Sequence, residues 1–179
     1  QTLGEVDSYV AIGSGGASAA AGPNHLFKFH AGDGGLRVPL ILSGPGVPVA
    51  QTVDEFTLMA DIAPTLLDLA SIIDTPPDGA KPFTGRSLGP LLTGEAGYVY
   101  GPDDAVGFTT SGQAALIKGN YKLVRNLPPH GDSIWRLFDL AEDPGETKDL
   151  SDELPDLKAE LMQDYRAYAD RVGVLALPE

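Results

Sequence analysis

The sequence predicts a partial α/β segment followed by a small α+β unit, and three patterns lead to this prediction. A short, nearly all-apolar run at residues 38–42 is typical of a strand covered on both faces, as in a parallel α/β sheet. A helical apolar stripe follows over residues 57–73. The last part of the chain holds four strand candidates and then one amphipathic helix, which predicts a four-stranded antiparallel sheet with a covering helix. We therefore expect two parts, residues 1–102 and 103–179.

The first part begins with residues 11–23, where glycine, alanine and serine have little side-chain area to bury. This composition favours a flexible connector, and a loop lining a cleft that belongs to missing chain is the alternative. The strand expected at residues 38–42 lies between Gly35 and Gly44. No other run before residue 90 resembles such a strand, so its neighbours must come from elsewhere.

The spacing of apolar residues over residues 57–73 predicts a helix. Pro64 falls in its first turn, where no backbone donor is required, and Asp61 is the expected N-cap. The apolar positions recur at helical spacing: Ile62, Leu66, Leu69, Ala70 and Ile73. Residues 74–102 are rich in proline and glycine, which favours a packed loop or one short helical turn.

The second part contains four strand candidates, at residues 106–110, 114–118, 121–125 and 135–139. Gly119-Asn120 separates the second from the third by the two residues that a tight hairpin needs. A helix is expected over residues 155–172, because its apolar residues form one stripe at steps of three and four.

The composition excludes several classes of function. Twelve Lys plus Arg against twenty-five Asp plus Glu give a formal charge of −13, which repels phosphate backbones and anionic lipid. We therefore expect no nucleic acid and no membrane among the partners, and no apolar stretch has the length to cross a bilayer. The chain has no cysteine, which excludes disulfides, thiol nucleophiles and Cys-ligated metals and leaves the compartment undecided.

Few residues suggest chemistry by themselves. His25 and His30 lie five apart without a carboxylate pair, so they do not predict a metal site. The acidic stretch at residues 139–156 lacks the alternation of a calcium loop and is expected to be solvated. Within it, Asp143-Pro144-Gly145-Glu146 predicts a tight turn in which Gly145 can take a positive φ. Lys28, between two phenylalanines, is either a solvated surface residue or a shielded cation that attracts an anion.

Taken together, four motifs resemble the C-terminal part of the sulfatase family, within the alkaline-phosphatase-like superfamily. They occur in the family's order and are spread over residues 8–172. The motifs are residues 26–28 with 34–39, residues 59–70, residues 85–94, and residues 119–123 joined to 135–140, 143–146 and 149–150.

The resemblance implies an enzyme that hydrolyses sulfate esters. Family members use a formylglycine, made from Cys or Ser in a C/S-x-P-x-R motif, together with a divalent cation, usually calcium. Fixed cations would neutralise charge on the transferring group, and a covalent intermediate would divide one hard step into two. The small C-terminal domain of the family helps close the substrate cleft.

The resemblance carries over to this chain residue by residue. Lys28 matches the family lysine that contacts the substrate sulfate. Arg37 matches a family arginine and is expected to hold the loop before the strand. The turn at Asp143, Pro144, Gly145 and Glu146 is expected to be structural. Residues 43–47 lack the closing arginine of the nucleophile motif, and the metal-binding segments have no match, so no cofactor is expected to bind this chain alone.

We therefore expect this chain, which begins at Gln1, to be a C-terminal piece of a longer sulfatase and to be inactive alone. The parent would act on a sulfate-ester small molecule or a sulfated glycan. Two alternatives stay open: a phosphonate monoester or phosphodiester hydrolase of the same superfamily, and a non-catalytic acidic binding module. A truncated strand also exposes apolar faces and edges, so we expect self-association or poor order around residues 8–46.

Overall fold

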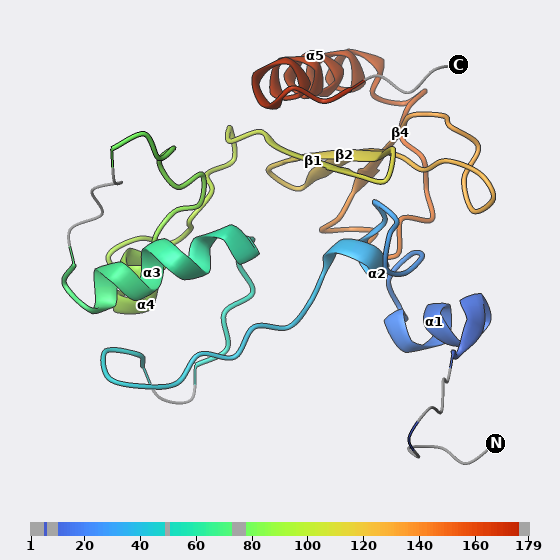
Figure 1. Ribbon diagram of the computed structural model, residues 1–179. Coiled ribbons are helices and arrows are strands. Elements are labelled where there is room, and N and C mark those ends of the chain that lie inside the picture. The colour runs from blue at the N-terminus through green and yellow to red at the C-terminus, as the bar shows by residue number, and fades with distance from the viewer. Residues whose placement is uncertain (1–5, 7–10, 49–50, 73–77, 176–179) are drawn as a thin grey trace. The chain divides into compact units, whose positions relative to one another are not determined.

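The computed structural model describes residues 6, 11–48, 51–72 and 78–175 (Figure 1). Contacts divide the chain into two compact units, the first made of Gln1–Val38 with Asp104–Glu179 and the second of Pro39–Asp103. The N-terminal segment therefore packs with the C-terminal sheet. The assignment of residues 1–102 to a larger α/β catalytic domain stays a prediction.

The first unit contains the four-stranded antiparallel sheet that the sequence predicts, and its strands form a meander. Its strands are β1 (Val106–Thr110), β2 (Gln113–Lys118), β3 (Tyr121–Arg125) and β4 (Arg136–Asp139), in the order β1-β2-β3-β4. The expected hairpin joins β2 to β3, with Lys118 opposite Tyr121. Gly119 has a φ of 55°, the left-handed conformation that a two-residue turn requires and that glycine adopts without steric cost.

Helix α5 (Pro155–Val172) covers one face of this sheet, in agreement with the sequence prediction (Figure 1). The helix approaches β1 closely at Gly107, where an added Cβ would lie 2.3 Å from the ring of Tyr168. The buried core of this layer consists of Ala114, Leu116, Leu123, Leu137, Leu161 and Tyr165. Full burial of each large apolar side chain contributes about 1.5–3 kcal/mol. Among the described residues, no helix has the length and apolar character needed to cross a membrane.

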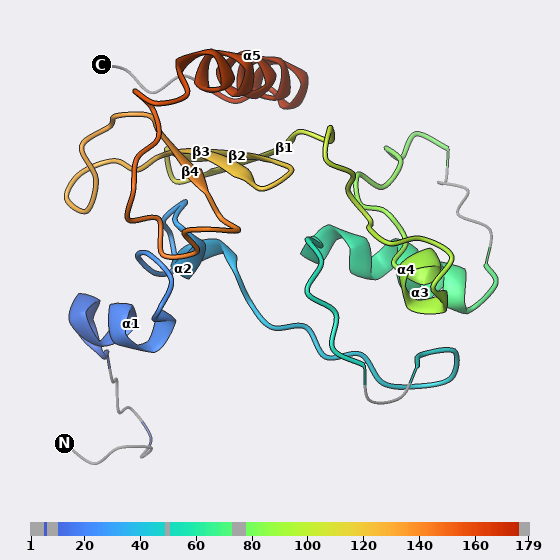
Figure 2. The same cartoon turned by 180° about the vertical axis from the view of Figure 1, so that it is seen from behind.

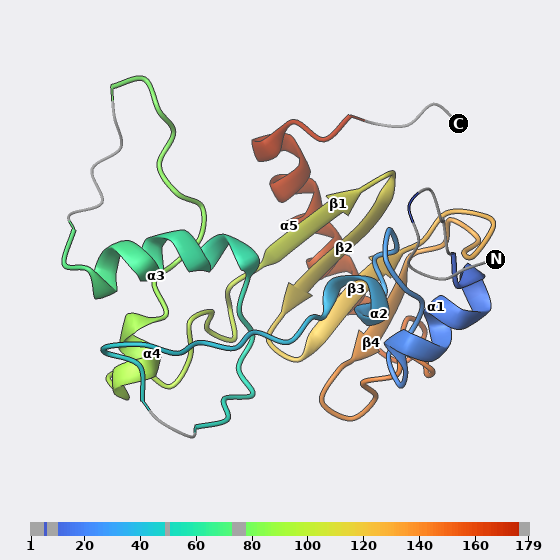
Figure 3. The same ribbon diagram turned by 60° about the horizontal axis from the view of Figure 1, so that its bottom comes forward.

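The opposite face of the sheet is covered by a short helix, α2 (Asp33–Leu36), and the residues just before it. Figures 2 and 3 show α2 and α5 on opposite sides of the strands. Ala31 is buried here against Ala115, Val124 and Phe138. Because successive side chains of a strand point to opposite faces, this second cover explains why five consecutive residues of β2 are buried.

Two sequence predictions for the N-terminal residues are wrong. No strand forms at residues 38–42, where Val38 and Ile41 are exposed. An apolar run becomes a strand only beside a partner, and within the described ranges the strands of the sheet come from residues 106–139. Residues 11–23, expected to be a flexible connector, contain helix α1 (Gly13–Ala21), which ends in the alanines that favour helix most strongly. Self-association stays a prediction.

The second unit is built on the helix predicted over residues 57–73, which is shorter than expected. A 3₁₀ turn, η1 (Met59–Asp61), leads into α3 (Ile62–Leu69), and a left-handed residue at Ser71 follows. Ile73 lies outside the described residues. The short turn expected within residues 74–102 is α4 (Gly89–Thr93).

Asp61 does not cap α3 as expected, because its carboxylate is used elsewhere. Its side chain is buried and accepts hydrogen bonds from the N–H of Leu58 (2.7 Å), the N–H of Arg86 (2.8 Å) and the hydroxyl of Tyr100 (2.6 Å). These contacts join the Gly85-Arg86 loop to the start of the helix. The single carboxylate of Asp61 therefore holds three segments of the second unit together through hydrogen bonds to its two oxygens.

Candidate functional site

Lys28 lies in a tight turn of the first unit. The N–H of His30 donates to the carbonyl of Phe27 at 3.1 Å, which makes Lys28 and Phe29 the two central residues. The Lys28 side chain is exposed, and its Nζ lies 5.1 Å from the centre of the Phe29 ring. The ammonium is therefore accessible, as contact with a ligand requires.

The backbone of this turn is strained. Phe29 has a φ of 79° and Leu26 a φ of 63°, both in the left-handed region that bulky residues rarely adopt. Each such residue costs roughly 1–3 kcal/mol, and the conformation persists only where the surroundings determine it. The turn that carries Lys28 is therefore held in place by its contacts.

Glycines allow the turn to lie directly on α2. A Cβ added to Gly34 would fall 2.1 Å from the carbonyl oxygen of Leu26, and one added to Gly35 would fall 2.2 Å from that of His30. The N–H of Gly34 donates to the carbonyl of His25 at 2.8 Å. The close approach of two backbones thus requires glycine at both Gly34 and Gly35.

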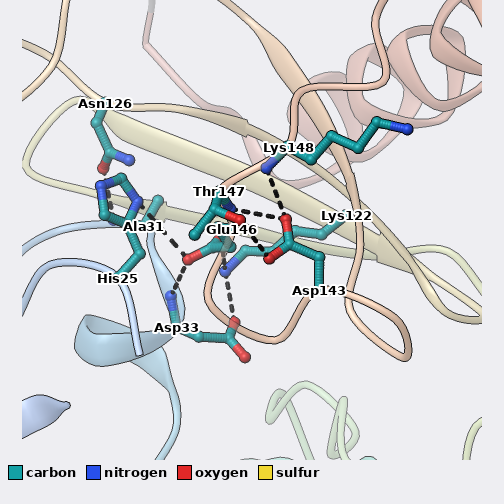
Figure 4. Close-up of polar contacts among 9 residues, drawn as sticks. All are labelled: His25, Ala31, Asp33, Lys122, Asn126, Asp143, Glu146, Thr147 and Lys148. Carbon is teal, nitrogen blue, oxygen red and sulfur yellow. Dashed lines mark hydrogen bonds and ion pairs between the residues drawn. The ribbon is translucent and has the colours of Figure 1, made fainter. Parts of the chain in front are cut away.

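Three charged side chains form a buried charge cluster between α2 and the sheet: Asp33 of α2, Lys122 of β3 and Glu146 (Figure 4). Lys122 is fully buried, and its Nζ donates to Asp33 Oδ1 at 2.6 Å. Glu146 Oε1 lies 2.9 Å from the same Nζ without the geometry of a hydrogen bond, so this contact is an ion pair. Glu146 Oε2 accepts the N–H of Asp33 at 2.8 Å.

The buried charge cluster joins segments that lie far apart in the sequence. Asp33 is 89 residues from Lys122 and 113 from Glu146. A second anchor lies beside it, where the N–H of Ala31 donates to Asn126 Oδ1 at 2.8 Å (Figure 4). Side chains from residues 122–146 therefore hold the backbone just after Lys28 at two points.

The Asp143–Glu146 turn forms as predicted but differs in two respects. The positive φ expected at Gly145 occurs at Glu146, with a φ of 53°. Glu146 is also buried, although the acidic stretch was expected to be solvated, because its carboxylate faces Lys122 and the N–H of Asp33. Its position follows from contacts that are distant in sequence.

Asp143 stabilises this turn. Its carboxylate accepts the N–H of Thr147 at 2.7 Å, the N–H of Lys148 at 2.8 Å and the Thr147 hydroxyl at 2.9 Å (Figure 4). The bond from the Lys148 N–H, with those from Thr147, holds the pKa of Asp143 below its ordinary value. The turn that presents Glu146 is therefore itself fixed by hydrogen bonds.

The fold brings the histidines together beside Lys28. The rings of Phe27, His30 and His130 meet edge-on, with centroids 4.8–5.2 Å apart. Burial lowers the pKa of His30, and the neighbouring His130 and His25 lower it further. Among the described residues, no group of three or more His, Cys, Asp or Glu side chains could hold a metal ion.

The structure places the remaining sequence candidate without assigning it a role. Arg37 follows α2, its N–H donates to the carbonyl of Asp33 at 2.8 Å, and its side chain lies at the surface. The sequence analysis did not select Lys122. The signal that could have pointed to it is its position among the apolar residues of a strand. The roles carried over to Lys28 and Arg37 stay predictions.

Comparisons with known proteins agree with this arrangement. A family model described as N-sulphoglucosamine sulphohydrolase, C-terminal, matches residues 27–168. An uncharacterized sulfatase of Schizosaccharomyces pombe is 33% identical over 190 aligned residues, which cover 100% of this chain and 33% of that protein.

Two solved structures share the fold. The crystal structure of Ps i-CgsB in complex with k-i-k-neocarrahexaose gives a TM-score of 0.68 at 20% identity, covering 83% of this chain and 32% of that one. A structure in complex with its substrate, D-glucosamine-2-N,6-O-disulfate, gives a TM-score of 0.52 at 21% identity, covering 69% of this chain and 26% of that one.

These similarities extend over most of the sequence. The chain spans about a third or less of the length of the relatives described above. The family model matches well over half of it, and the matched region includes Lys28, α2 and the whole sheet. The chain belongs to the sulfatase family, and it carries the family's C-terminal portion.

Proposed function

We propose that the whole protein to which this chain belongs hydrolyses sulfate esters, and that Lys28 contacts the sulfate group. The observation that carries this proposal is an accessible ammonium on a turn whose strained backbone is anchored to the sheet. A cation that is fixed before the substrate arrives can stabilise charge in the transition state without reorganising.

The role of Lys28 in this reaction is electrostatic. Hydrolysis adds water across the bond between sulfur and the ester oxygen, and it releases an alcohol and sulfate. Lys28 Nζ would donate a charge-assisted hydrogen bond to a sulfate oxygen throughout and would transfer no proton. Because the chain carries a formal charge of −13, its overall field opposes an anion, so binding depends on such local cations.

The nucleophile and the metal belong, in this proposal, to polypeptide outside the chain. The sulfatase resemblance implies a formylglycine and a divalent cation, usually calcium. The described residues do not fit a metal site, since no group of three potential ligands is close enough. The role proposed for Lys28 does not depend on such a site, and the 179-residue chain alone is expected to be inactive.

A sulfated sugar is the substrate class that the comparisons support best. The matching family model takes its description from N-sulphoglucosamine sulphohydrolase, and one structural relative was solved with a glucosamine disulfate as its substrate. Phosphonate or phosphodiester hydrolysis is not favoured, because the relative that aligns with the whole chain is named a sulfatase. The same similarity disfavours a non-catalytic acidic binding module.

The test replaces two exposed lysines in the full-length protein. Lys28→Ala is expected to lower kcat/KM for p-nitrophenyl sulfate and for glucosamine disulfate by about 10²–10³-fold, the loss typical of one transition-state donor. Lys148→Ala is the matched control, because Lys148 is 63% exposed in a surface pair with Glu153. Its kcat/KM should stay within about twofold of the wild-type value, since exposed pairs contribute little.

Two results would contradict the proposal. If Lys28→Ala keeps the kcat/KM of the wild-type protein, Lys28 does not contact the sulfate. If the 179-residue chain alone hydrolyses p-nitrophenyl sulfate at a robust rate, the division of catalytic groups between this chain and the rest of the protein is wrong.

A further inference from the structure

We propose that Glu146 and Lys122 are positioning residues for Lys28. Through Asp33, the buried charge cluster holds residues 25–37 against the sheet and so sets where the Lys28 ammonium lies. The inference rests on the proposed function, because it concerns the same lysine. It gives the C-terminal sheet a part in catalysis through the position of that lysine.

The Lys28 turn and α2 move as one body. The backbones of the two segments touch, and a Cβ at Gly34 would already overlap the carbonyl of Leu26. The N–H of Gly34 also donates to the carbonyl of His25 at 2.8 Å. A displacement of α2 must therefore displace the turn that carries Lys28.

Helix α2 is fixed by its first residue. Asp33 is held twice, through its carboxylate by Lys122 at 2.6 Å and through its backbone N–H by Glu146 at 2.8 Å. Both partners are buried, so water does not compete for these contacts. Hydrogen bonds to charged groups are directional and stronger than those between neutral groups, which fixes orientation as well as distance.

The rigidity of this arrangement comes from the elements that carry Glu146 and Lys122. Glu146 extends from a turn that Asp143 closes by accepting the N–H groups of Thr147 and Lys148. Lys122 extends from β3, in the interior of the sheet between β2 and β4. The two residues that hold Asp33 therefore stand on supports that are themselves rigid.

The Lys28 turn needs such support. Leu26 and Phe29 are both held in left-handed conformations, which relax when the surrounding contacts weaken. Stability alone does not explain the buried charge cluster, because apolar side chains of similar volume are often as stabilising as a buried ion pair. A precise position for the neighbouring cation is a role that apolar packing supplies less well.

The test is a double-mutant cycle in the full-length protein, with Lys28→Ala and Glu146→Gln made singly and together. Glutamine has nearly the shape of glutamate and leaves Lys122 paired with Asp33, so one buried cation still faces one buried anion. We expect Glu146→Gln to lower kcat/KM for sulfate-ester hydrolysis by about tenfold or more in the wild-type background. In the Lys28→Ala background, Glu146→Gln should lower kcat/KM by less than about twofold, because the ammonium that Glu146 positions is gone.

Leu161→Val is the matched control. Leu161 belongs to α5 and is buried against the other face of the sheet, so this substitution lowers stability without touching residues 25–37. Its effect on kcat/KM should be small and equal in both backgrounds. Amide hydrogen exchange gives a readout independent of catalysis: Glu146→Gln should speed exchange at Asp33 and Gly34 by about tenfold, and Leu161→Val should leave it unchanged.

The outcomes separate this inference from the proposed function. If Glu146→Gln lowers kcat/KM equally in both backgrounds, Glu146 has only a structural role and the positioning inference fails, while the role of Lys28 stands. If exchange at Asp33 and Gly34 is unchanged in Glu146→Gln, the buried charge cluster does not hold the turn and the inference also fails. If Lys28→Ala has no effect, the proposed function fails whatever the exchange rates show.

Discussion

Replacing Lys122 with methionine should be among the most damaging single changes in the first unit. Its ammonium is fully buried between Asp33 and Glu146, whose side chains are 8% and 0% exposed. Methionine keeps the length of the apolar stem but leaves two buried carboxylates facing each other without a cation. Removing one partner of a buried ion pair costs about 3–5 kcal/mol in the free energy of unfolding, and we expect a loss in this range.

The same substitution at a partly exposed position provides the scale for comparison. Lys118 is on the neighbouring strand, 19% exposed, and it pairs with Glu160 and Asp164 of α5. Because these partners are reached by water and salt, Lys118→Met should cost no more than about 1 kcal/mol. Both variants change lysine to methionine in the same sheet, so their difference isolates the effect of burial.

Denaturation can be followed in the 179-residue chain by the fluorescence of its single tryptophan, Trp135, whose ring lies 4.7 Å from that of Tyr165. At about 2–4 °C per kcal/mol for a domain of this size, Lys122→Met should lower Tm by roughly 6–20 °C. Lys118→Met should lower it by less than about 4 °C. If the two variants lose equal stability, the buried charge cluster contributes no more than the partly exposed pairs of Lys118, and the reasoning is refuted.

Three further changes have expected outcomes. Gly34→Ala should destabilise the first unit by more than about 2 kcal/mol in urea denaturation, because its Cβ would lie 2.1 Å from the Leu26 carbonyl oxygen; a neutral effect would contradict the close approach. Asp143→Ala should cost about 1–3 kcal/mol at pH 7. Because the Asp143 pKa is lowered, that stabilisation is present above about pH 3.8 and is lost as the pH falls through the lowered pKa. If Asp143→Ala still differs from the wild type in stability at the lowest pH, the stabilisation does not come from the ionised carboxylate. The His30 pKa is lowered too, so stability should fall as the pH drops below about 6.5. His30→Phe should remove this dependence when Tm is measured over a series of pH values. If the slope of Tm against pH is unchanged in this variant, the dependence belongs to another group.

Local signals were sufficient to predict the C-terminal sheet and its helix. Gly119-Asn120 sets the register of one hairpin, and the apolar residues within each strand of four to six positions are enough to predict it. The helix over residues 155–172 is amphipathic along its whole length, so its apolar stripe indicates both its extent and its buried face. These elements depend on neighbours that are close in sequence.

The elements that the sequence did not predict depend on distant partners. The apolar run at residues 38–42 indicates a preference for burial but does not supply the strand that it would pair with. The covering role of α2 was not visible in four residues that include two glycines. A helix this short is stabilised by tertiary contacts rather than by its own propensity.

The candidate site could be predicted only in part, for the same reason. Lys28 could be selected by its resemblance to a family motif, but its anchoring depends on partners about a hundred residues away. One signal was available in the sequence: Lys122 lies between Tyr121 and Leu123 in a strand rich in apolar residues. A lysine buried in such a strand requires a carboxylate partner, although the sequence does not say which one.

The most direct test of the central claim is a crystal structure of the full-length protein with sulfate or a sulfated sugar bound. The account predicts that Lys28 Nζ lies about 2.7–2.9 Å from a sulfate oxygen, with the turn in the conformation described above. The same structure with Glu146→Gln should show the turn displaced. A sulfate group bound at the reaction centre with the Lys28 ammonium directed away from it would contradict the account.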